Sequence, residues 1–192
     1  MQEIKVWDLL VRLLHWSLVV SVVGAWLTRE GNELRHEQLG YAALTIVAVR
    51  FVWGFIGSRY ARFGEFVRSP GKTLRYLWAV VVHREPHYVG HNPLGGWMIV
   101  MLLATIAVIG GTGWLYTTDA YWGVAWVGEL HEGATDFLIV LVALHVAGVV
   151  FTSIRQKENL VKAMITGTKR VPDQMPAASA GERKEPAVEL RH

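Results

Sequence analysis

The sequence predicts an all-α integral membrane protein built as a four-helix bundle. The chain has 192 residues, of which 52% are apolar and only 18% are charged. An ordinary soluble domain is about 45–50% apolar and about 25% charged. The apolar excess is concentrated in four stretches, each close to the length of about 17–25 residues that crosses a hydrocarbon core. These stretches lack the polar outer face that a soluble helix presents to water, so we interpret them as membrane helices.

The four membrane helices are expected near residues 9–28, 37–57, 95–117 and 131–154. The first is free of charge from Leu13 to Leu27, and in the second Arg50 is the only charged residue from Leu39 to Gly57. The third lies in a stretch without aspartate, glutamate, lysine or arginine, and the fourth is free of charge from Phe137 to Ile154. Each stretch is therefore apolar enough to cross the membrane once.

The lysines and arginines predict how these helices are oriented. Sixteen of the nineteen lie before the first helix core, in the loop between the second and third helices, or after Ile154. Only Arg29 and Arg35 lie on the other side of the bundle. Because cytoplasmic loops are enriched in basic residues, both termini are expected in the cytoplasm. The net charge is only +3, without a dense basic block, which argues against nucleic-acid binding.

Two further segments complete the predicted organisation. Residues 73–83 mix leucine, valine and tryptophan with Arg75, which favours an amphipathic helix at the membrane interface over an ordinary loop. Residues 171–192 are rich in proline, alanine, glutamate and lysine and lack apolar periodicity, which predicts a disordered polar tail. The membrane domain is accordingly expected to cover residues 1–170.

Four of the eight histidines lie in or beside the expected membrane helices, namely His15, His36, His131 and His145. Ionisable side chains inside a membrane are costly and tend to be functional or paired. His131 and His145 are 14 residues apart on one helix, which places them on a shared face about 21 Å apart along the axis. By depth, His15 pairs with His145 near the inner side, and His36 pairs with His131 near the outer side.

Three other histidines follow one another at intervals of four in the loop before the third helix. His83, His87 and His91 would lie on one face of a helix, as in some metal sites. Pro86 and Pro93 argue against a continuous helix at this point. We therefore interpret these histidines as loop residues rather than as metal ligands.

Two stacked histidine pairs, each joining two helices, suit a transmembrane path for electrons. The iron of a b-type haem takes axial ligands from above and below the ring, and two histidines on facing helices fill both positions. The chain contains no cysteine, which excludes disulfides, iron–sulfur clusters and the covalent attachment of c-type haem. A proton or metal-ion path along the same histidines is the alternative interpretation.

Small and basic residues extend the two predicted haem sites. Gly40 lies one helical turn after His36, where a flat macrocycle needs space. Arg50 lies at the depth of the inner pair, and Arg12 lies one turn before His15. Arginine is well suited to pairing with carboxylates, so both are candidate partners of the inner haem propionates. Snorkelling to lipid headgroups is the alternative, above all for Arg12.

Several motifs together resemble bacterial cytochrome b561 and the b-type cytochrome subunits of hydrogenases. The resemblance covers about residues 4–170, and it implies a four-helix cytochrome of the bacterial inner membrane with two non-covalent b haems. It further implies that the iron ligands are His15, His36, His131 and His145. The motifs are Val6-Trp7-Asp8, His15-Trp16, His36 with Gly40 and Arg50, His91-Asn92-Pro93-Leu94-Gly95, and His131-Glu132 followed by Leu144-His145.

The resemblance also implies electron transfer between a quinone pool and a redox partner in the periplasm. In a hydrogenase-like version, a soluble protein supplies electrons at the outer side and quinone is reduced near the inner side. In a superoxide:quinone oxidoreductase version, quinone reacts at the outer side and superoxide is the one-electron partner. A histidine-lined proton or metal transporter and a structural membrane anchor are the rival functions. Besides lipid, a second copy is an expected partner, because two-fold dimers are the commonest oligomers.

Overall fold

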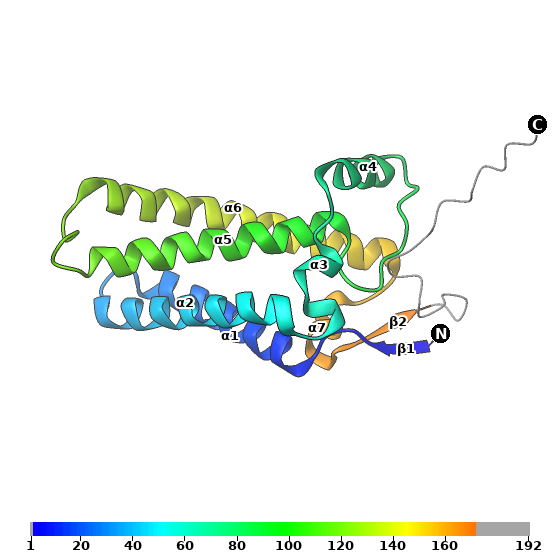
Figure 1. Ribbon diagram of the computed structural model, residues 1–192, viewed down its shortest axis with the longest axis horizontal. Helices are drawn as coiled ribbons and strands as arrows, with labels where there is room; N and C mark the ends of the chain where they lie inside the picture. Colours follow the sequence, from blue (N-terminus) through cyan, green and yellow to red (C-terminus); the bar gives the residue numbers. More distant parts are fainter. Residues whose placement is uncertain (1, 172–192) are drawn as a thin grey trace, which may run out of the picture.

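Four long helices form a bundle in the computed structural model, which describes residues 2–171 (Figure 1). In this view α1 and α2 form one layer of the bundle, and α5 and α6 form the other. All four are long and apolar enough to cross a membrane, which confirms the predicted all-α membrane bundle. Their bounds are α1 (Leu9–Thr28), α2 (Glu33–Ile56), α5 (Pro93–Tyr116) and α6 (Ala125–Gln156).

Side-chain caps determine where three of these helices begin. Asp8 accepts a hydrogen bond from the Val11 amide at 2.8 Å before α1. Asn32 and Asn92 accept equivalent bonds at the starts of α2 and α5. Such caps satisfy amides that have no partner inside the helix. They also explain why α2 begins four residues before the expected span, because its first turn is polar and helical.

The end of α6 is a left-handed cap at a residue other than glycine. Lys157 has φ of 51°, and the Glu158 amide donates to the Ser153 carbonyl at 3.0 Å. This is the hydrogen-bond pattern of a Schellman cap, in which glycine is the favoured residue. A lysine side chain at this position therefore costs conformational energy.

Replacing Lys157 with glycine is expected to stabilise the protein by up to about 1 kcal/mol, because glycine adopts the left-handed conformation without a Cβ clash. Thermal unfolding in detergent measures the change, with Lys162→Gly inside helix α7 (Leu160–Thr166) as the opposite control. Lys162→Gly should lower the stability of the protein, since glycine is unfavourable within a helix. A loss of stability in Lys157→Gly would contradict this expectation. It would show that the lysine side chain stabilises the protein by more than its left-handed backbone conformation destabilises it.

The smaller elements gather at the end of the bundle that carries both described termini, which we call the inner end (Figure 1). Strands β1 and β2 pair antiparallel, a feature absent from the predicted all-helical organisation. The predicted tail lies outside the described residues from position 172 onward. The remaining elements are β1 (Gln2–Lys5), η1 (Arg59–Ala61), α3 (Phe63–Phe66), α4 (Pro70–Val81) and β2 (Thr168–Val171).

Helix α4 is amphipathic. Its Tyr76 is buried and packs edge-to-face on Tyr88. Leu74, Trp78 and Val81 are exposed, and Trp78 is 68% accessible. A helix with one apolar face exposed beside a membrane bundle suits the lipid interface, so an interfacial position for α4 stays our prediction.

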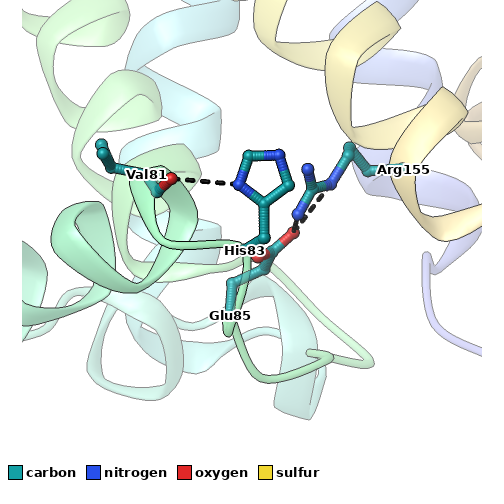
Figure 2. Close-up of polar contacts among 4 residues, drawn as sticks. All are labelled: Val81, His83, Glu85 and Arg155. Atoms are coloured by element: carbon teal, nitrogen blue, oxygen red, sulfur yellow. Dashed lines mark hydrogen bonds and ion pairs between the residues drawn. The ribbon is translucent and has the colours of Figure 1, made fainter.

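The loop after α4 is fastened to the end of α6 by an ion pair, shown in Figure 2. Arg155 donates from Nε at 3.0 Å and from Nη2 at 2.6 Å to one carboxylate oxygen of Glu85. His83 precedes this pair in the left-handed conformation, with φ of 58°, and its Nδ1 lies 3.0 Å from the Val81 carbonyl. A hydrogen bond to this carboxyl from the backbone of Glu85 itself, together with the contact and charge of Arg155, lowers the pKa of the carboxyl. The pair is therefore charged at neutral pH. The loop carrying His87 and His91 is thereby held against the bundle.

Candidate haem sites

The outer histidine pair joins α2 to α6. The imidazole centroids of His36 and His131 lie 6.2 Å apart, with the rings inclined at 69°. Two metal–imidazole bonds of about 2 Å would place two ring centroids about 6 Å apart on opposite sides of one ion. The side chains of this predicted pair therefore meet at a spacing that suits bis-histidine ligation.

Backbone carbonyls set the hydrogen position on both of these rings. His36 Nδ1 lies 2.9 Å from the Ala25 carbonyl of α1, and His131 Nδ1 lies 3.0 Å from the Ile109 carbonyl of α5. A carbonyl only accepts, so each Nδ1 must carry the hydrogen and each Nε2 is left with a lone pair. This is the tautomer that binds a metal through Nε2, with the other nitrogen oriented by a hydrogen bond.

Two glycines leave room around the outer pair. A Cβ atom on Gly113 of α5 would lie 3.3 Å from Cε1 of His131, so glycine lets the helix approach the ring. A Cβ atom on Gly40 would meet no other heavy atom within 4 Å, so this face of α2 is open one turn beyond His36. An open strip beside a histidine fits the flat edge of a macrocycle.

The predicted inner pair comprises His15 on α1 and His145 on α6, and both side chains are half-buried. The His15 ring packs edge-to-face on Trp16, with centroids 5.1 Å apart. Its Nδ1 is buried and has no hydrogen-bond partner among the described residues. Buried polar atoms without partners are rare and indicate that another group completes the site.

The two predicted propionate partners each keep an unused donor. Arg50 is 7% exposed, and its Nη2 donates to the Ala61 carbonyl at 3.0 Å, while its Nη1 is buried without a partner in residues 2–171. Arg12 donates from Nη1 to the Ile165 carbonyl of α7, and its Nε is likewise buried without a partner in this part of the chain. A buried guanidinium is stable only when it is paired with an acceptor, and a carboxylate is its best match.

The helices whose histidines are paired do not pack closely against each other. Among the described helices, α1 packs closely on α2, α2 on α5 and α5 on α6, but neither α1 nor α2 makes an extensive backbone approach to α6. Between the two histidine levels lies an apolar cluster of Ala43, Val47, Ile106 and Leu138. The bundle thus has an apolar layer between the two histidine levels, and the donors present at each level fit a b-type haem.

Sequence reasoning missed His91 as part of the inner region. Its ring packs against Trp7 and Phe66, with centroids 4.4 and 4.9 Å away, and its Nδ1 is buried without a described partner. Burial, followed by the charges of Lys169 and Arg50 and by the inner histidines, lowers the pKa of His91 to about 3. Its position beside the Asn92 cap was visible in the sequence. The spacing of four with His83 and His87, however, suggested three histidines on one helix face rather than a single buried ring. The described residues contain no cluster of three or more metal-binding side chains there.

A buried ion pair in the inner end was also missed. Lys169 of β2 lies 3.5 Å from Glu158, and their side chains are only 4% and 9% exposed. Burial lowers the pKa of Lys169, while the Glu158 carboxylate raises it in part. Lys169 lies just before the polar segment 171–192, which lacks apolar periodicity, so nothing in the local pattern indicated that it is buried.

A profile of the family described as prokaryotic cytochrome b561 matches residues 6–167 of the chain. The chain belongs to the prokaryotic cytochrome b561 family. This cytochrome is accordingly a multi-pass membrane protein of electron transport that binds b-type haem. The matched range includes both histidine pairs and all four long helices up to their inner ends.

Relatives of this cytochrome carry the name "Probable Ni/Fe-hydrogenase B-type cytochrome subunit". The protein from Azotobacter vinelandii is 24% identical, over 90% of this chain and 91% of its own length. Those from Bradyrhizobium diazoefficiens and Rhizobium leguminosarum bv. viciae are each 25% identical. The first of these two alignments covers 88% of this chain and 87% of the relative, and the second covers 90% and 91%. The similarity is thus spread over whole chains rather than confined to one motif.

Proposed function

We propose that this cytochrome carries electrons across the bacterial inner membrane between a quinone pool and a redox partner at the outer end, using two b-type haems. The observation that carries the proposal is the outer pair, His36 and His131. Their ring spacing, and the backbone carbonyls that hold each Nδ1, support one iron between them. Haem iron with two imidazole ligands supplies reversible one-electron transfer.

The second haem is assigned to His15 and His145. The buried Nδ1 of His15 and the unused donors of Arg12 and Arg50 support a cofactor with carboxylates at this level. In this proposal the two arginines bind the propionates of the inner haem. Their positive charge favours the reduced haem because it offsets the negative charge of the added electron. Gly40 of α2 admits the edge of the outer macrocycle.

The partner is proposed by analogy with the relatives. Since those proteins are named as hydrogenase cytochrome subunits, we propose that a hydrogenase-like soluble redox protein docks at the outer end. The orientation with both termini in the cytoplasm would place that end in the periplasm. Quinone would then exchange electrons on the inner side of the membrane.

Stopped-flow absorbance of the purified cytochrome in lipid nanodiscs tests this function. We expect a quinol analogue to reduce the haems, or a quinone analogue to oxidise them, within the time of enzymatic turnover. The His36→Ala variant should retain exchange with quinone if quinone reacts at the inner side. Failure of both analogues to exchange electrons with wild type would contradict the quinone assignment. Fast haem reduction by superoxide, abolished by superoxide dismutase, would favour the superoxide:quinone activity instead.

A further inference from the structure

His91 is fixed in place before α5 by its neighbours in the chain and in space. Asn92 caps α5 through a 2.7 Å hydrogen bond from the Gly95 amide, and Pro93 follows at the first helical position, fully buried. The rings of Trp7 and Phe66 pack on the imidazole. A buried side chain packed against two aromatic rings loses rotational freedom, so its ring nitrogens are restricted in direction.

Among the described residues, none supplies a hydrogen-bond acceptor for Nδ1 of His91. Nδ1 of His91 is buried, and no described residue makes a hydrogen bond with it. Leaving a buried polar atom unpaired costs about 1–3 kcal/mol. The side chains that act electrostatically on His91 are Lys169, Arg50, His145 and His15, which bring positive charge or ligating nitrogen and no acceptor carboxylate. The groups that act electrostatically on His91 are therefore hydrogen-bond donors or histidines, and none of them is a carboxylate.

We propose that His91 donates a hydrogen bond from Nδ1 to a propionate of the inner haem, completing a three-residue carboxylate site with Arg12 and Arg50. All three side chains have a buried nitrogen without a partner among the described residues, and the four oxygens of two propionates are enough to accept from these three nitrogens. A neutral imidazole offers one N–H donor, which is a weaker and more directional contact than a guanidinium. The proposal rests on the inner haem assigned above to His15 and His145.

This hydrogen bond makes the inner haem easier to reduce. A donor at a propionate offsets part of its negative charge, and reduction adds one more negative charge to the same low-dielectric region. Without the donor, the propionate charge opposes reduction more strongly. The inner haem should then shift toward its oxidised form, while the outer haem, about 20 Å away by helix rise, should not.

Redox potentiometry followed by absorbance, on the haem-loaded protein in nanodiscs, measures the midpoint potential of each haem. His91→Phe keeps an aromatic ring between Trp7 and Phe66 and removes the donor. We expect the equilibrium constant for reduction of the inner haem to fall by about threefold to tenfold. For a one-electron couple, this lowers its midpoint potential by up to about 59 mV, and the midpoint potential of the outer haem should not change. His91→Gln, which restores a side-chain N–H, should recover part of this shift. His83→Asn is the matched control from the same loop and should leave both potentials as in wild type.

The outcomes separate this proposal from the function on which it rests. Two unchanged potentials in His91→Phe would overturn the hydrogen bond while leaving two haems in place. Loss of a haem in His91→Phe, with haem retained in His15→Ala, would make His91 an iron ligand and overturn both assignments. A change confined to the quinone concentration dependence, with both potentials unchanged, would place His91 at a quinone rather than at a propionate and would also overturn it. If His83→Asn shifted the midpoint potential of the inner haem by the same amount, the effect would come from the loop in general. That outcome would overturn the hydrogen bond as well.

Discussion

Replacing His36 or His131 with alanine is expected to remove the same haem and to leave the other haem bound. The two imidazole centroids lie 6.2 Å apart, and if both rings bind one iron, loss of either would leave it with one protein ligand. We expect haem content to fall by half in each variant, with the same component lost from the spectrum. His15→Ala and His145→Ala should remove the other component. Low-temperature absorbance and electron paramagnetic resonance distinguish the two haems.

The control for these replacements is a histidine outside both pairs. His83 is exposed and its Nδ1 lies beside the Val81 carbonyl, away from both histidine pairs in the sequence, so His83→Asn should retain both haems in full. The pairing by depth would be wrong if His36→Ala and His145→Ala removed the same haem. Double variants sharpen the test, since His36→Ala with His131→Ala should lose no more haem than either alone.

Replacing Asp8 with alanine is expected to destabilise the inner end by about 2–4 kcal/mol, because one carboxylate joins three segments. It accepts from the Val11 amide at 2.8 Å, from Trp53 Nε1 at 3.2 Å and from the hydroxyl of Ser58. These donors belong to the start of α1, the end of α2 and the turn that follows α2. Unfolding in mixed micelles, monitored by circular dichroism, measures the loss. Asp119→Ala, at an exposed position in the outer loop, is the matched control and should change stability by less than about 0.5 kcal/mol.

The same carboxylate predicts a dependence of stability on pH. Burial raises the pKa of Asp8, but hydrogen bonds from Ser58, Val11 and Trp53 outweigh it and hold the pKa below 3.8. A group with a depressed folded-state pKa stabilises the protein above its unfolded pKa and loses that contribution as pH falls toward the folded value. Wild type should therefore lose stability below about pH 4 more steeply than Asp8→Ala. Parallel pH curves for the two proteins would contradict the role of this carboxylate.

The four membrane helices were predictable because a lipid environment demands long apolar segments, and such segments are visible without any alignment. The helix ends were less predictable. Helix α2 starts at Glu33 because Asn32 caps a polar first turn, and hydropathy does not detect such a turn. The strand pair at the inner end joins residues more than 160 positions apart, and its short strands have no distinctive pattern of their own.

The histidine levels were predictable for a related reason, since helical rise converts sequence separation into depth. Depth alone brought His36 and His131 together as a hypothesis, and their rings do meet in the structure. The hydrogen bonds that fix their tautomers come from the carbonyls of Ala25 and Ile109, which the sequence cannot indicate because every residue has a carbonyl. His91 does lie in a loop, as the neighbouring prolines indicate, but its burial was not predictable because it depends on Trp7 and Phe66, which approach it only in the folded inner end.

The central claim is that each chain holds two b-type haems between paired histidines. A reduced-minus-oxidised absorbance spectrum, combined with haem extraction and protein quantification on the purified membrane protein, tests it most directly. We expect about two non-covalent haems per chain, with two resolvable b-type components, because each of two histidine pairs provides two axial ligands. One haem per chain, or none after expression with sufficient haem, would contradict the claim.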